Sequence, residues 1–306
     1  MTDAAQPETE KRRAAKVETP WQRFVSEFAE SKIAVGALVV LVAIIMAALF
    51  APWIATQDPY DLATVSIMDS RMPPGSTSFE GMPFYLGTDG AGRDLFSAIL
   101  YGLRVSLAVG VMSAIIALIV GMTVGLTAAY VGGRVEALIM RIVDVQLSMP
   151  AVLIALILLA VLGKGVDKII IALVVAQWAY YARTVRGSAL VERSKEYVEA
   201  ARGLALPHRR VVFRHIMPNC LAPLIVVVTV QTAHAIALEA TLSFLGVGLP
   251  PTEPSLGLLI ANGFEYVMSG SYWIATFPGI ALLITIMSIN MVGDRLRDVL
   301  NPRLSR

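Results

Sequence analysis

The chain has 306 residues, of which 56% are hydrophobic and only 16% are charged. A soluble domain averages roughly 45–50% apolar and about 25% charged residues, so this composition excludes an ordinary soluble protein and indicates a polytopic membrane protein. The net charge of +2 suggests no nucleic-acid partner, and the single cysteine excludes an internal disulfide or a cysteine-built metal site.

The first 32 residues are polar and of mixed charge, so we expect a cytoplasmic tail without a cleavable signal peptide in the usual place. Within them, residues 1–20 have the composition of a disordered tail. Residues 21–30 gather their aromatic and aliphatic side chains on one face, as in an interfacial helix. Residues 33–57 carry no charge and predict the first transmembrane helix, because about 20 apolar residues cross a bilayer.

Residues 58–103 are expected on the extracytoplasmic side. The part from 58 to 94 is polar and contains several prolines, so we expect little regular structure there. It ends in the glycine-rich sequence LGTDGAGRD at 86–94, in which an aspartate can cap the next helix. Two interpretations remain open: a helix cap alone, or a calcium or magnesium site at Asp89 and Asp94.

Five further apolar stretches give an all-α membrane protein with six transmembrane helices. They are expected at 105–133, 135–162, 168–187, 220–244 and 273–293, within a transmembrane core at 104–295 that precedes a C-terminal segment at 296–306. With six crossings, the tail, the turn at 132–141, the charged region 183–219 and the C-terminus share one side and hold 20 of the 25 Lys and Arg residues. Positive residues stay in the cytoplasm, so both termini are predicted to be cytoplasmic.

The loop 188–219 is strongly charged and interrupts two apolar stretches. Its first part, at 194–206, predicts a short helix with these residues on one face: Tyr197, Ala200, Ala201 and Leu204. Pro207 is expected to end that helix, and a second short helix is expected at about 208–217. Such a protrusion suits a groove on a partner. The alternative is a basic loop that merely follows the topology rule.

Two motifs in this loop resemble the EAA loop of bacterial ABC importer permeases: Glu199-Ala200-Ala201 and Ile216-Met217-Pro218. The resemblance implies a cytoplasmic coupling helix seated in a cleft of an ATPase subunit. It assigns to ATPase coupling the residues Tyr197, Glu199, Ala200, Ala201, Arg202, Gly203, Ala205, Ile216 and Pro218.

One position of the loop departs from the family pattern. The family usually has glycine six residues after the glutamate. This chain has Ala205 there and a glycine two residues earlier, at Gly203. We therefore expect a differently built turn, with help from Pro207.

The sequence LGTDGAGRD, followed by YGLRVSL at 101–107, is similar to the signature of the peptide/nickel branch of these permeases, and specifically of its C-type subunit. The family often has leucine where this chain has Ala91. The signature residues are Gly87, Thr88, Asp89, Gly92, Arg93 and Asp94. The resemblance continues to the C-terminus and leaves residues 1–20 and parts of 61–83 unmatched.

The resemblance implies a type I ABC importer permease core in the bacterial inner membrane. It further implies a homologous B-type permease partner, two ABC ATPase subunits and an extracytoplasmic substrate-binding protein. We expect a di- or oligopeptide substrate, with nickel, opines or another small solute as alternatives. The chain has no G-x-x-x-x-G-K-[ST] phosphate loop, so ATP and magnesium are expected on the ATPase subunits, and no cofactor or metal on this chain.

A transporter driven by an ion gradient is the rival class. It would show internal repeats and paired ionisable groups near the bilayer midplane, and neither is clear in the sequence. An intramembrane enzyme would need a convergent nucleophile or a metal set, which is absent from the sequence as well.

Among the ionisable groups in or near the expected helices, those at three places are candidates for a functional role. Arg141 and Asp144 lie three residues apart on one helical face, which predicts an interfacial pair, with a role in the transport pathway as the alternative. Glu239 faces either the pathway or a neighbouring helix. Asp294, with Arg295 and Arg297, is interpreted as the cytoplasmic end of the sixth helix.

Overall fold

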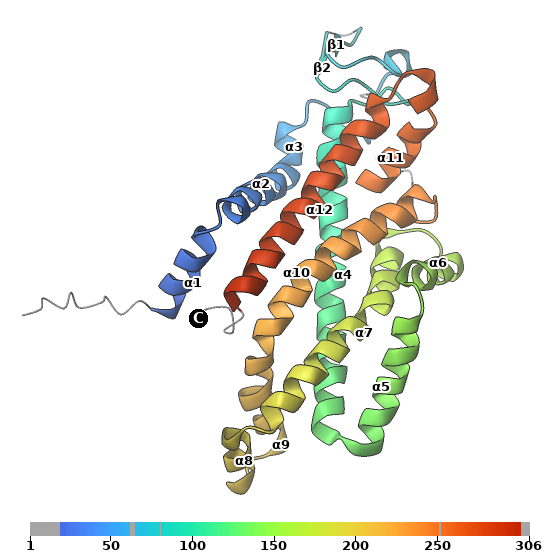
Figure 1. Cartoon of the computed structure of the whole chain (residues 1–306). Helices are drawn as coiled ribbons and strands as arrows, with labels where there is room; N and C mark the ends of the chain where they lie inside the picture. Colours follow the sequence, from blue (N-terminus) through green and yellow to red (C-terminus); the bar gives the residue numbers. More distant parts are fainter. Residues whose placement is uncertain (1–18, 62–64, 80, 251, 301–306) are drawn as a thin grey trace, which may run out of the picture.

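Two long helices, α4 (Leu95–Val131) and α7 (Val166–Arg193), lie at the centre of the molecule (Figure 1). This arrangement comes from a computed structural model that describes residues 19–61, 65–79, 81–250 and 252–300. Gly121 of α4 lies against α7, since a Cβ there would come within 2.5 Å of the carbonyl oxygen of Trp178. Gly125, one turn later, lies equally close to Ala182. Glycines four residues apart allow this close approach of helices in a membrane.

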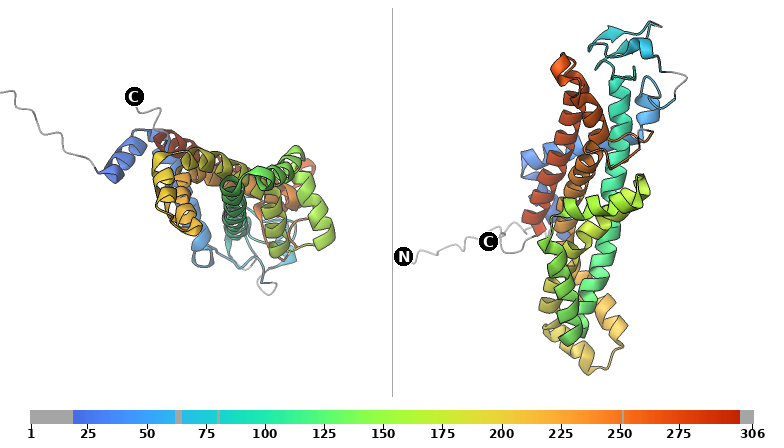
Figure 2. Two further views of the ribbon diagram at one scale, coloured as in Figure 1. Left: turned by 90° about the horizontal axis from the view of Figure 1, so that it is seen from below. Right: turned by 90° about the vertical axis from the view of Figure 1, so that its right-hand side faces the viewer.

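The remaining elements surround this pair, and Figure 2 shows them from two further sides. In chain order they are α1 (Pro20–Ala29), α2 (Lys32–Leu49), α3 (Ala51–Ile54), η1 (Ile67–Asp69), β1 (Ser76–Thr77), β2 (Pro83–Phe84), α5 (Gly133–Ser148), α6 (Ala151–Leu162), α8 (Glu196–Gly203), α9 (His208–Arg210), η2 (Val211–Ile216), α10 (Met217–Phe244), α11 (Leu256–Phe264), η3 (Val267–Ser269) and α12 (Trp273–Leu300).

The N-terminal elements follow the sequence prediction closely. Thr19 and Gln22 form a capping box at the start of α1, in which each side chain bonds the backbone of the other. α2 packs against α12 and carries the first apolar stretch. Of the expected tail at 1–20, residues 1–18 lie outside the described residues.

The third expected span is not one helix. α5 and α6 meet at Met149 and Pro150 with a bend of 91°. A proline restricts the residue before it to extended backbone, so a helix tends to end there. Met149 has that conformation, with φ −97° and ψ 139°.

The prediction of a separate short helix at about 208–217 is also wrong. α9, the π-helical η2 and α10 form one continuous helix from His208 to Phe244. Pro218 therefore lies within a helix, just after the π turn. Its ring has no N–H and would press on the carbonyl four residues back, and the wider π turn relieves that contact.

α11 is a short helix that the sequence did not predict. It packs between α10 and α12, on the side of the molecule where β1 and β2 lie (Figure 1). Gly257 at its start touches the α10 backbone, since a Cβ there would come within 2.5 Å of Cα of Ala240. This short helix thus completes the end of the bundle that lies near β1 and β2.

The expected all-α membrane fold is confirmed, apart from the two-residue strands β1 and β2, which pair antiparallel. Four described helices are long and apolar enough to cross a membrane, and the bent pair α5 and α6 makes a fifth. α7 has 28 residues but carries several charges, so length and composition alone do not reproduce the count of six.

Candidate functional site

The predicted coupling loop lies at the far end of the molecule from β1 and β2 (Figure 1). It is shorter than the expected range 188–219, because α7 continues to Arg193 and the next long helix begins at His208. Between them stands α8, with 8 residues instead of the 13 expected from 194 to 206. At about 1.5 Å per residue, α8 is about 12 Å long. We call residues 194–207 the α8 loop.

The turn after α8 keeps the conformation that a glycine would favour. Ala205 has φ +54°, in the left-handed region. Its N–H donates to the carbonyl of Arg202 at 2.9 Å, and the N–H of Leu206 donates to the carbonyl of Ala201 at 3.2 Å. These two bonds define a Schellman motif. The expectation of a differently built turn was therefore wrong.

The roles expected for the other turn residues change with it. Gly203 is helical and has open space around it. Pro207 does not end α8; it stands at the N-cap of α9.

One face of α8 packs on the rest of the chain. Val198 and Ala201 are buried at 0% and 5% exposure, in a cluster that also holds Ile216. The expected apolar face is therefore divided, because Ala201 points inward while the other three members are exposed: Tyr197, Ala200 and Leu204. The remaining predicted coupling residues are also exposed: Glu199, Arg202, Gly203, Ala205 and Pro218.

A polar network fixes α8 between α7 and α10. The Tyr197 hydroxyl donates to Oε2 of Glu192 at 2.6 Å, and Lys195 Nζ donates to the other carboxylate oxygen at 2.5 Å. Asn219 Nδ2 donates to the Tyr197 oxygen at 3.1 Å and to the His215 carbonyl at 2.7 Å. Burial, followed by the Glu192 bond, raises the pKa of Tyr197 to about 12. The phenol thus stays protonated and able to donate at neutral pH.

A second set of contacts joins the α8 loop region to the end of α4. Arg193 donates to the carbonyl of Ala129 at 2.7 Å. The Tyr130 hydroxyl lies 2.5 Å from Nδ1 of His208, and the Arg202 guanidinium stands 5.5 Å from the centre of the Tyr130 ring. A cation over an aromatic face is attracted by the ring quadrupole. α8 and the residues that flank it are thus in contact with α4, α7 and α10.

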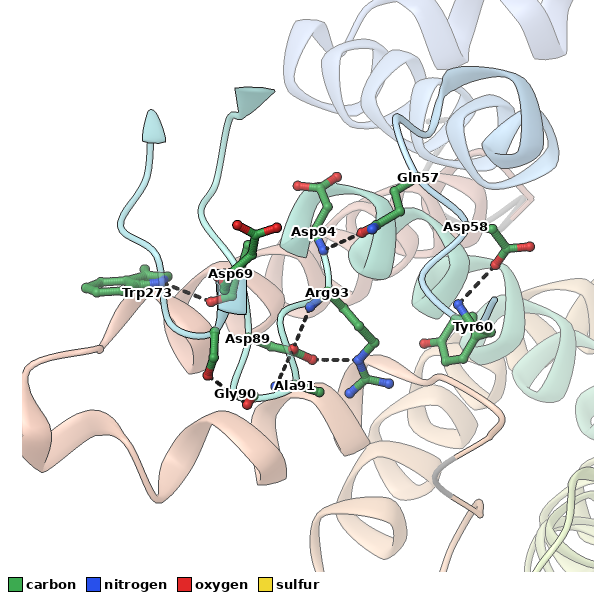
Figure 3. A network of polar contacts seen from close by, with 12 residues as sticks. Gln57, Asp58, Tyr60, Asp69, Asp89, Gly90, Ala91, Arg93, Asp94 and Trp273 are labelled. Atoms are coloured by element: carbon green, nitrogen blue, oxygen red, sulfur yellow. Dashed lines mark hydrogen bonds and ion pairs between the residues drawn. The ribbon is translucent and has the colours of Figure 1, made fainter. Parts of the chain in front are cut away.

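At the opposite end, the glycine-rich signature forms a network of polar contacts (Figure 3). The Asp89 carboxylate accepts the N–H groups of Ala91 and Arg93 at 2.8 and 3.0 Å and Nε of Arg93 at 2.7 Å. The Thr88 hydroxyl donates to the Asp69 carbonyl at 2.5 Å and accepts the N–H of Met72 at 2.8 Å. Gly87 and Gly92 have φ +81° and +84°, which glycine adopts without strain.

Asp94 caps α4, as predicted. Its Oδ2 accepts the N–H and the hydroxyl of Ser97 at 3.0 and 2.6 Å and the hydroxyl of Thr56 at 2.7 Å. Its own N–H donates to Oε1 of Gln57 at 3.0 Å. The signature thus joins the end of the first span to the start of α4. The bonds that Asp94 makes to Ser97 support the helix-cap interpretation.

The predicted pair of Arg141 and Asp144 does not form. Asp144 pairs instead with Arg183 of α7. A second pair across the same helices joins Glu136 and Arg186 at 2.5 Å. These bridges hold α5 to α7, which supports the structural interpretation over a role in the pathway.

Glu239 contacts a neighbouring helix, one of the two alternatives left open. Its side chain is fully buried, and its carboxylate accepts the hydroxyls of Ser106 on α4 at 2.9 Å and Ser243 at 2.7 Å. Ser106 in turn accepts the N–H of Leu256, at the start of α11, at 3.3 Å. Sequence spacing could not find this network, because its members lie up to 150 residues apart.

Comparisons with known proteins identify the family of this chain. A family model described as "Binding-protein-dependent transport system inner membrane component" matches residues 121–306, and one described as "N-terminal TM domain of oligopeptide transport permease C" matches residues 19–74. The dipeptide transport system permease protein DppC of Escherichia coli (strain K12) is 40% identical over 288 residues, covering 94% of this chain and 95% of that protein. The di/tripeptide transport system permease protein DppC of Pseudomonas aeruginosa is 37% identical over 287 residues, covering 94% and 93%.

A solved structure shows the same fold. The inward-facing MetNI methionine ABC transporter matches with a TM-score of 0.54 at 19% identity, over 67% of this chain and 96% of that one. At that identity the likeness concerns the fold alone.

Proposed function

The chain belongs to the family of binding-protein-dependent transport system inner membrane components, and we propose that it is the permease subunit through which an ABC importer brings di- or oligopeptides into a bacterial cell. The observation that supports the peptide substrate is the identity of 37–40%, over nearly the full length, to permeases named for dipeptide and di/tripeptide transport. Nickel, opines or another small solute remain the alternatives within the same architecture.

The proposed mechanism places the energy source on other chains. Two ABC ATPase subunits bind ATP and magnesium, a B-type permease forms the other half of the pathway, and an extracytoplasmic binding protein delivers the peptide. Both termini and the α8 loop lie in the cytoplasm, in keeping with the distribution of Lys and Arg. ATPase closure pushes α8, and its contacts with α4, α7 and α10 transmit the movement.

Two features of α8 support this mechanism. Its outer face includes Ala200 and Gly203, which have little or no side chain and let a partner approach the backbone closely. Its inner face is fixed by buried apolar contacts and by the Tyr197 network, so α8 moves as one body with the helix ends it joins. A transmission element has to be rigid in this way, because ATP is hydrolysed on a different subunit.

Uptake experiments test the substrate and the energy source. Deletion of the gene in its own host should abolish uptake of labelled dialanine, and the intact gene supplied on a plasmid should restore it. In membrane vesicles, uptake should follow internal ATP and persist with a proton uncoupler. If peptide uptake survives the deletion while uptake of nickel or an opine is lost, that solute replaces the peptide as the proposed substrate. Uptake that survives ATP depletion would favour an ion-coupled secondary transporter.

A further inference from the structure

A cavity of about 810 Å³ lies among α7, α10 and α12, away from both sites described above. Cavities that hold small ligands measure about 300–1,000 Å³, with mostly apolar walls and a few convergent polar groups. This one follows that pattern. Its lining includes an apolar wall on α10: Ala222, Pro223, Val226, Val227 and Val230. Its polar groups come from all three helices: Tyr180, Thr184, Gln231, Asp294 and Arg297.

The two charged residues of the cavity have no ion-pair partner among the residues that the structure describes. Asp294 and Arg297 both belong to α12 and are exposed. They stand three residues apart, a spacing at which opposite charges on a helix commonly pair. Yet neither forms an ion pair with the other or with any residue that the structure describes. An anion and a cation therefore both face the cavity, free to bind a molecule that carries both charges.

The buried amide of Gln231 adds a third polar group. Its side chain is only 7% exposed, lines the cavity and makes no hydrogen bond to the part of the chain that the structure describes. Because the residue lines the cavity, water or a ligand there can bond its amide. A partner subunit packed against the cavity would instead have to bury the Asp294 carboxylate, and aspartate is depleted at protein interfaces.

We propose that this cavity is a transit site for the zwitterionic backbone of a short peptide, with Asp294 binding the α-ammonium group and Arg297 the α-carboxylate. The proposal rests on the proposed peptide function. The termini of a dipeptide lie about 5–6 Å apart, because successive Cα atoms are 3.8 Å apart. Residues three apart on a helix have Cβ atoms separated by about the same distance.

The apolar wall on α10 explains why such a site would accept peptides of many sequences. Aliphatic side chains offer no hydrogen bonds that could select among peptide side chains, whereas the two termini are common to all short peptides. Both charges are exposed to water, which keeps binding weak. A transport site has to be weak in this sense, since the substrate must also leave.

Photo-labelling of the complete transporter in nanodiscs, without binding protein, tests the site directly. The probe is the diazirine dipeptide photoleucyl-alanine, and the adducts are located by mass spectrometry. We expect a saturable adduct on the α10 segment 222–231. Unlabelled dialanine should compete for it, whereas N-acetyl-dialanine amide, which lacks both charges, should not. Asp294→Asn and Arg297→Gln should each lower the labelling up to about fivefold, as expected from the loss of one solvent-exposed ion pair.

Two further variants make the result specific. Asp298→Asn changes an exposed aspartate on the same helix that does not line the cavity, and it should label like the wild type. The exchange of Asp294→Arg together with Arg297→Asp should label more strongly than either single variant, because the peptide can bind in the reverse direction. Every variant is compared at an equal amount of assembled complex.

The outcomes separate this proposal from the proposed function. Suppose that the wild type imports dialanine. The transit site is then wrong if labelling is absent, if it is equal in all variants, or if the capped dipeptide reduces it as much as dialanine does. In each of these cases the peptide function stands. If the wild type imports no dipeptide, both proposals fall.

Discussion

Tyr197 on α8 donates a 2.6 Å hydrogen bond to Glu192, the last acidic residue of α7. The same phenol oxygen accepts Asn219 from the start of α10. One side chain of the short helix thus joins the two long helices that flank it. Because ATPase movement has to pass through α8 in the proposed mechanism, this atom is a natural place to separate ATP hydrolysis from transport.

Tyr197→Phe should therefore uncouple the transporter. The ring stays in place, but the bond to the carboxylate is lost, and a hydrogen bond to a charged group contributes about 1.5–3 kcal/mol. We expect ATPase subunits to remain bound and the amount of peptide moved per ATP to fall severalfold. Proteoliposomes that report both rates give this ratio. Tyr85→Phe, the same change at an exposed tyrosine far from α8, is the control. An unchanged ratio in Tyr197→Phe would remove Tyr197 from the coupling route.

Ala205→Gly should stabilise the α8 loop. A left-handed conformation costs an L-residue roughly 1–2 kcal/mol, and glycine is free of that cost. We expect slower amide hydrogen exchange in residues 196–206 and a local gain of about 1 kcal/mol.

Gly203→Ala tests a nearby position in the same turn. Gly203 is helical with open space around it, so alanine should also stabilise the loop, by about 0.5–1 kcal/mol. Faster exchange in Ala205→Gly would contradict the observed turn.

Glu239 should matter for stability through its two hydroxyl partners. Glu239→Ala removes the acceptors for Ser106 and Ser243 and leaves buried polar groups unsatisfied, at a cost of about 1–3 kcal/mol in the free energy of unfolding. Glu239→Gln retains one acceptor oxygen, so its free energy of unfolding should fall less. Thermal denaturation in detergent measures the order, with the exposed Glu265→Ala as control. Equal stability of Glu239→Ala and Glu265→Ala would show that this network contributes nothing.

Asp144 and Arg183 should be coupled energetically, and Asp144 and Arg141 should not. Both partners of the observed pair are more than half exposed, so the coupling energy is expected to be small, at most about 1 kcal/mol. A double-mutant cycle with Asp144→Asn and Arg183→Gln isolates it. The parallel cycle with Arg141→Gln serves as the reference and should give purely additive effects. The reverse result would restore the pair that residue spacing predicts.

The sequence predicts local features of this protein better than contacts between distant segments. The aspartate cap of α4 and the apolar stretches depend on residues close together in the chain, and Asp94 caps α4 as expected. The bend at Met149 also had a local signal in Pro150, which a prediction based on apolar length overlooked. Asp144 shows the limit of such reasoning. Its partner lies 39 residues away, whereas spacing on one helix could suggest only Arg141.

The same limit explains why the α8 loop could be predicted only in part. Helix periodicity places Tyr197, Ala200, Ala201 and Leu204 together but does not say which residue turns toward the rest of the chain. Val198, outside that set, and Ala201 are the buried members, because they meet Val211 and Ile216 from the following helix. The left-handed turn at Ala205 was missed because alanine carries no signal for it.

Ala200 and Ala201 provide the sharpest test of the coupling surface, because they are adjacent and differ in burial. Ala200 is exposed, whereas Ala201 is 5% exposed and packs against the chain's own core. A tryptophan at Ala200 can point into solvent without disturbing the permease, but it would obstruct a subunit seated on that face. Overpacking a close contact costs about 1–3 kcal/mol, which corresponds to a loss of affinity between about fivefold and about a hundredfold.

Ala200→Trp should thus leave the amount of permease in the membrane unchanged and reduce the ATPase subunits recovered in a pull-down, together with transport. Ala201→Trp should instead destabilise the α8 loop and lower the amount of permease itself. Glu199→Lys, also on the exposed face, should behave like Ala200→Trp if the ATPase subunit contacts that side chain. Comparison at matched permease levels decides the matter. If Ala200→Trp binds the ATPase subunits and transports normally, this face of α8 is not where they dock.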